Sequence, residues 1–79
     1  MKSEHLFSTY DIGLATALLT AGHKLYEMDK SNRKKVCFHF VKVKTIDKNV
    51  DDYWVSQLKV DARSFFENLK SLKNRIYSF

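Results

Sequence analysis

The chain has 79 residues, with 14 Lys and Arg against 9 Asp and Glu, and a formal net charge of +5. A chain this short buries only about 60–65% of its unfolded surface, so we expect one small domain, residues 1–79. Cys37 is the only cysteine, which excludes an internal disulfide. One cysteine and three histidines also argue against a closed zinc site. A lone cysteine and no long apolar segment predict a cytoplasmic protein, neither exported nor membrane-spanning.

The first predicted element is a helix that begins after Ser8, its candidate cap. Ser8 and Asp11 in "STYD" resemble a capping box, and the run "IGLATALLTAG" ends at Gly22, a residue typical of the position just past a helix. Apolar residues cover most of this helix, which is more than a two-layer monomer of this length is expected to bury. We therefore expect a homodimer with Leu14 and Leu18 at its interface.

Two strands are predicted next, "HKLYEM" and "KVCFHFVKVKT", because both are rich in β-branched and aromatic residues. The loop "DKSNRKK" joins them into a hairpin, with Ser31 and Asn32 at its turn. Both faces of the second strand are apolar in its middle, so we expect this strand to be central or covered on both sides.

The rest of the chain is predicted to be helical. "NVDDYWVSQ" has Asn49 as its candidate cap, and "VDARSFFENLKSLKNRIYSF" begins a second helix after Asp61. The apolar stripe expected on that helix is Ala62, Phe65, Phe66, Leu69, Leu72 and Ile76. The predicted fold is α+β, a two-layer single domain of order α-β-β-α-α with an antiparallel β-hairpin packed by helices.

Both ends of the chain resemble a known family. The segments "STYDIGLATALLTAG" and "DYWVSQLKVDARSFFENLKSLKNRIY" are similar to short proteins of phages, prophages and their bacterial hosts, filed as domain of unknown function 5659. The resemblance covers nearly the whole chain and implies a mobile-element origin. If a phage encodes the protein, the resemblance implies that the protein is located in the cytosol of the host cell. It implies no activity and supplies no site residues.

Candidate catalytic groups are sparse. Cys37 and His39 share a strand face, but side-by-side neighbours of this kind seldom have the geometry for nucleophilic attack. With two glycines in the chain there is no glycine-rich phosphate loop. Asp51 and Asp52 are adjacent on a helix and point about 100° apart, which suits the helix N-terminus better than a shared metal or proton. We expect no enzyme activity, no cofactor and no metal site.

Positive charge is concentrated in the middle of the chain. Residues 30–48 carry seven basic side chains and one acidic side chain, whereas residues 1–29 carry two basic and four acidic. Localised positive charge favours polyanions, so we expect nucleic acid, DNA or RNA, to bind through its phosphates with weak sequence specificity. The alternative is a solvated turn. The candidate contacts are Lys30, Arg33, Lys34 and Lys35 in the loop and Lys42 and Lys44 at the far end of the strand.

The segment "FHFVKV" raises a second mode of binding. It matches the tail of an RNA-recognition motif, in which strand aromatics stack on bases. The basic–glycine pair that precedes this tail in the motif is missing. If "HLF" near the N-terminus is a first strand, the order βαββα also mimics that fold, but no sequence remains for its fourth strand. We expect Phe38 and Phe40 to be core residues instead.

A different function class remains open. Tyr10, Tyr53 and Trp54, with the apolar first helix, could form the interface of a module that inhibits or redirects a host or defence protein. A small-molecule binder in the cleft of a dimer is a third possibility.

Overall fold

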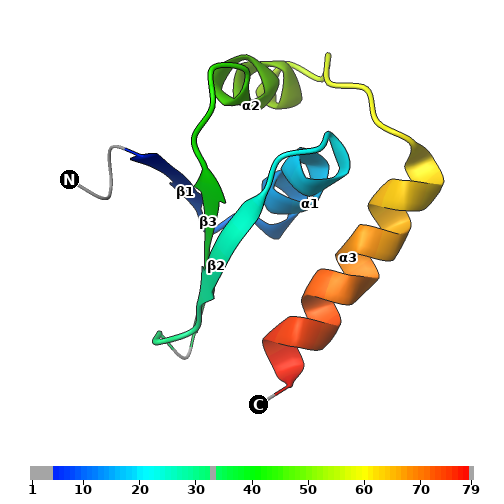
Figure 1. Cartoon of the computed structure of the whole chain (residues 1–79). Coiled ribbons are helices and arrows are strands. Elements are labelled where there is room, and N and C mark those ends of the chain that lie inside the picture. Colours follow the sequence, from blue (N-terminus) through cyan, green and yellow to red (C-terminus); the bar gives the residue numbers. More distant parts are fainter. Residues whose placement is uncertain (1–4, 33, 79) are drawn as a thin grey trace.

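The computed structural model describes residues 5–32 and 34–78, which form a three-stranded sheet and three helices (Figure 1). The predicted α+β class, with helices packed on an antiparallel sheet, is confirmed. The elements in chain order are β1 (Leu6–Thr9), α1 (Ile12–Thr20), β2 (Leu25–Asp29), β3 (Cys37–Val41), α2 (Ile46–Trp54) and α3 (Ala62–Tyr77). None of the helices in this described part of the chain is long and apolar enough to cross a membrane.

The structure adds one strand, β1, to the predicted order. It pairs antiparallel with β3, from Leu6 opposite Val41 to Thr9 opposite Phe38. The sheet order is β1-β3-β2, so β3 is the central strand as predicted. A strand of four residues is too short to show a clear alternating pattern, and its hydrogen bonds come from a partner some thirty residues away.

One face of the sheet packs against the helices. Phe38 and Phe40 of β3 point to this face and are fully buried, which confirms that they are core residues and leaves neither available to stack on bases. Cys37, His39 and Val41 point to the opposite face and are half-buried. The core consists of Leu14, Ala15, Leu18, Phe38, Phe40, Ile46 and Leu72.

Helix α1 lies between the sheet and α3, with α2 close by (Figure 1). The Asp11 carboxylate caps its start by accepting a 3.0 Å hydrogen bond from the Leu14 N–H, whereas Ser8, the predicted cap, lies in β1. Gly22 follows the end of α1 at φ 104°, as predicted. Leu14 and Leu18 were expected at a dimer interface, but both are core residues of the single chain. One chain covers the apolar circumference of α1 from several sides, so that argument for a homodimer is wrong.

The last two helices differ from the prediction in detail. Helix α2 begins after Thr45, whereas Asn49 lies inside it. Helix α3 begins after Asp61 as predicted, and the Asp61 carboxylate accepts a 2.8 Å hydrogen bond from the Ser64 N–H. Phe66 and Ala62 of the predicted stripe are exposed, because α1 contacts only one narrow side of α3.

Candidate nucleic-acid interface

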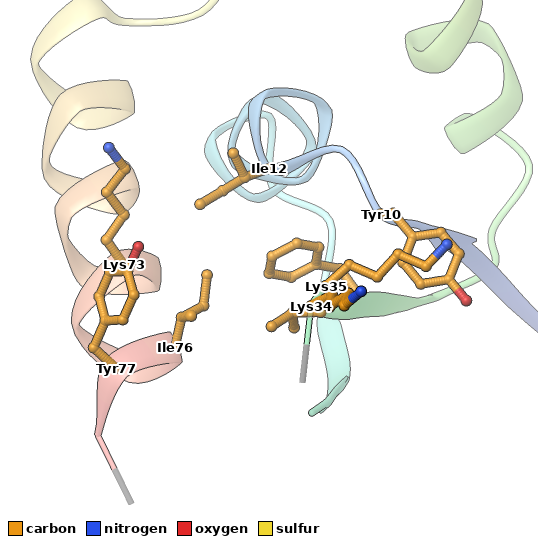
Figure 2. Close-up of a pocket in the computed structure, with 9 residues that line it drawn as sticks. Tyr10, Ile12, Lys34, Lys35, Lys73, Ile76 and Tyr77 are labelled. Carbon is orange, nitrogen blue, oxygen red and sulfur yellow. The ribbon is translucent and has the colours of Figure 1, made fainter. Parts of the chain in front are cut away.

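The C-terminal half of α3 and the loop between β2 and β3 face each other across a groove of about 380 Å³, the lysine groove. Figure 2 shows Lys73, Ile76 and Tyr77 of α3 on one side and Lys34 and Lys35 on the other. The lining residues are Tyr10, Ile12, Lys34, Lys35, Val36, Phe38, Lys73, Ile76 and Tyr77. Two segments far apart in the sequence therefore contribute lysines to the two sides of one groove.

Two side chains shape the loop that carries Lys34. The Asp29 carboxylate accepts a 2.9 Å hydrogen bond from the Ser31 N–H, and the Asn32 side-chain oxygen accepts a 2.8 Å bond from the Lys34 N–H. Each is an Asx turn, which the turn residues in the sequence favour. The Ser31 N–H also lowers the pKa of the Asp29 carboxyl, because it stabilises the ionised form.

Lys30 makes a contact that the sequence did not predict. Its ammonium donates hydrogen bonds to the carbonyl oxygens of Arg75, at 2.8 Å, and of Ser78, at 2.7 Å. A cation at this position is favourable, because the C-terminal end of a helix carries partial negative charge. Lys30 was predicted to bind nucleic acid; in the structure it holds the hairpin loop against the last turn of α3.

Three lysines give the groove its charge. The described lining residues include Lys34, Lys35 and Lys73 and no carboxylate. The Lys35 ammonium lies 4.3 Å from the centroid of the Tyr10 ring, a cation–π contact that orients the lysine. Cations gathered along a concave surface raise the local potential and attract anions.

Sequence reasoning missed Lys73 and Tyr77. Lys73 shares a face of α3 with Tyr77, four residues on, and with Ile76, three residues on, which the predicted apolar stripe did contain. The spacing is visible in the sequence. Which element that face meets is decided by how α3 packs, and no local pattern encodes it.

The other predicted basic residues lie elsewhere. Lys42 and Lys44 are exposed after the end of β3, whereas Lys34 and Lys35 come before its start. Five strand residues span about 17 Å, so the two pairs sit at opposite ends of the sheet. Arg33 lies outside the described residues.

The predicted interface aromatics divide between two sites. Tyr10 lines the lysine groove and is 57% exposed. Tyr53 and Trp54 are on α2, with ring centroids 5.0 Å apart in an edge-to-face contact. Trp54 is 60% exposed, while Tyr53 is half-buried against the core. Burial, and next the charge of Asp11, raises the pKa of the Tyr53 hydroxyl.

The other sheet face carries the polar side chains of Ser8, Cys37 and His39. Burial, and next the nearby Asp29 charge, raises the pKa of the Cys37 thiol, so the thiol is protonated at neutral pH. The Ser8 hydroxyl and His39 Nδ1 are hydrogen bonded at 2.6 Å across β1 and β3. Within residues 5–32 and 34–78, no cluster of three His, Cys, Asp or Glu side chains could hold a metal ion.

Comparison with known proteins identifies the family but no activity. The model of the family described as "Domain of unknown function (DUF5659)" matches residues 4–78. Searches of curated proteins and of solved structures each found no match. Because the family model spans nearly the whole chain, the resemblance seen at the two ends is confirmed. The chain belongs to the DUF5659 family.

Proposed function

We propose that this protein binds nucleic acid through the lysine groove, by contacts to phosphates, with weak sequence specificity and without catalysis. The observation that carries the proposal is that Lys34 and Lys35 from the hairpin and Lys73 from α3 line the same groove. A lysine ammonium is a compact cation that pairs well with phosphate oxygens. Three lysines around one concave surface suit the binding of a flexible polyanion. A turn that is merely solvated would not need a third lysine from α3.

The remaining features fit the same role. A single cysteine is usual in a reducing cytosol, which is where nucleic acid and this protein would meet. In keeping with the resemblance to phage and prophage proteins, we propose that this cytosol is that of a bacterial host. The net charge of +5 would also speed association with nucleic acid.

The test is a fluorescence-anisotropy titration of labelled oligonucleotides at low and moderate salt. We expect the triple variant Lys34→Ala, Lys35→Ala and Lys73→Ala to lose most of the affinity. The slope of log affinity against log salt should become shallower by roughly 0.7 to 0.9 for each phosphate contact removed. These side chains are exposed at the groove, so the variant is expected to stay folded.

A matched control separates the groove from overall charge. The triple variant Lys42→Ala, Lys44→Ala and Lys59→Ala removes three exposed lysines outside the groove and so has the same net charge as the first variant. We expect this control to bind nearly as well as the unaltered protein. Equal losses in both triple variants, or no binding by the unaltered protein at low salt, would contradict the proposal.

A second candidate function rests on the end of α2. Trp54 and the neighbouring Val55 are both exposed there, and exposed tryptophans often dominate protein interfaces. The alternative is therefore a module that inhibits or redirects a host or defence protein through Trp54. A host protein that co-purifies with the unaltered chain and is lost with Trp54→Ala would favour it, whereas identical captures would count against it.

A further inference from the structure

We infer that the lysine groove takes single-stranded nucleic acid in preference to a duplex, with a base stacked on Tyr77. This inference rests on the proposed function and specifies its ligand. Three observations carry it: how the hairpin is held, how much space the groove offers, and how Tyr77 is exposed.

The hairpin cannot enter a duplex groove alone. A two-stranded ribbon reads duplex DNA by protruding into a major groove about 12 Å wide. Here Lys30 ties the loop to the carbonyl oxygens of Arg75 and Ser78, at 2.8 and 2.7 Å, so the last turn of α3 lies beside it. A helix with its side chains is about 10–12 Å across, so the helix and hairpin together are too wide for that groove.

The space in the lysine groove suits one nucleotide. Its volume of about 380 Å³ lies near the small end of the range that binds compact ligands, about 300–1,000 Å³. Ile12, Val36 and Ile76 give it an apolar surface between the lysines. A single strand offers a flat base and a phosphate together, whereas a duplex keeps its bases stacked inside.

Tyr77 is the aromatic side chain best placed to receive that base. It is 76% exposed on the last turn of α3, and it stands beside Lys73 in Figure 2. Tyr10, the other tyrosine of the groove, has the Lys35 ammonium over its ring. Stacking on a tyrosine tolerates any base, which agrees with weak sequence specificity.

The experiment compares a labelled oligothymidine of about 15 nucleotides with its duplex at low salt, by anisotropy. We expect the single strand to bind more tightly. Tyr77→Ala should weaken single-strand binding by about 5- to 150-fold, and Tyr77→Phe should not. Tyr77→Leu, which keeps a bulky apolar side chain but removes the aromatic ring, should repeat the loss.

Tyr26→Ala is the matched control, since Tyr26 is an exposed tyrosine of β2 outside the groove. We expect its affinity to equal that of the unaltered protein. Suppose that duplex and single strand bind equally, that binding depends on the groove lysines, and that Tyr77→Ala and Tyr77→Leu do not change it. This result would overturn the inference and leave the proposed function standing. Binding of neither ligand would overturn both.

Discussion

Gly13 of α1 lies against Tyr53 of α2. A Cβ at this position would lie 2.6 Å from the Tyr53 hydroxyl oxygen and 3.2 Å from an Asp11 carboxylate oxygen. Alanine is ordinarily better than glycine in a helix by about 1 kcal/mol, but here it must displace a half-buried ring. We expect Gly13→Ala to lower the free energy of unfolding by about 1–3 kcal/mol, measured by urea denaturation.

The reason for that loss can be checked separately. Tyr53→Phe removes the oxygen that crowds position 13, so Gly13→Ala should be much less harmful in a Tyr53→Phe background. We expect a coupling energy of about 0.5–3 kcal/mol in the double-mutant cycle. If Gly13→Ala costs the same in both backgrounds, the contact with the hydroxyl is not what excludes a side chain.

His23 makes stability depend on pH. It is buried, and its Nε2 accepts a 2.7 Å hydrogen bond from the Asn49 side-chain amide. Burial lowers its pKa below the usual 6.5, because the charged form loses hydration. The unfolded chain then takes up a proton at a higher pH than the folded chain does. Stability from this residue is complete above about pH 6.5 and falls as the pH drops toward the folded pKa.

Urea midpoints measured between about pH 5 and pH 8 test this expectation. The unaltered protein should lose stability on the acid side, and His23→Gln should lose less with falling pH, whatever its stability at neutral pH. Parallel pH profiles for the two proteins would show that another group is responsible.

Helix α3 presents a narrower buried face than its sequence suggests. Leu72 is fully buried against α1, whereas Phe66 on the predicted stripe is exposed. We expect Leu72→Ala to cost about 2–5 kcal/mol by opening a cavity, and Phe66→Ala to change stability by no more than about 0.5 kcal/mol. Chemical denaturation of the two variants gives the comparison. Similar losses would mean that the wrong face of α3 is buried.

Helix ends were predictable where one side chain makes the cap. Asp61 and Gly22 were placed correctly, because a carboxylate that accepts an N–H and a glycine at positive φ are local features. The start of α2 was missed, since its cap residue, Thr45, makes no side-chain hydrogen bond there. Lys34 and Lys35 were found from charge alone, but that Lys73 lines the same groove depends on tertiary packing.

The whole molecule buries α1 without a second copy. The sheet, α2 and α3 surround Leu14 and Leu18, so the homodimer stays a prediction without the support of the apolar first helix. We expect Leu14→Asp to unfold the chain, because it places a charge in the core. Circular dichroism with sedimentation gives the result. A folded Leu14→Asp monomer, alongside a dimeric unaltered protein, would restore Leu14 to an interface.

The location of the binding surface can be read from backbone amide chemical shifts of the labelled protein, titrated with the single-stranded oligothymidine at low salt. We expect the perturbed residues to be Tyr10, residues 34–36 and residues 73–77, which surround the lysine groove. Binding at this site would be contradicted if the amide shifts of the lysine groove did not change. The perturbations would then be confined to the end of α2 around Trp54 or to the sheet face around His39.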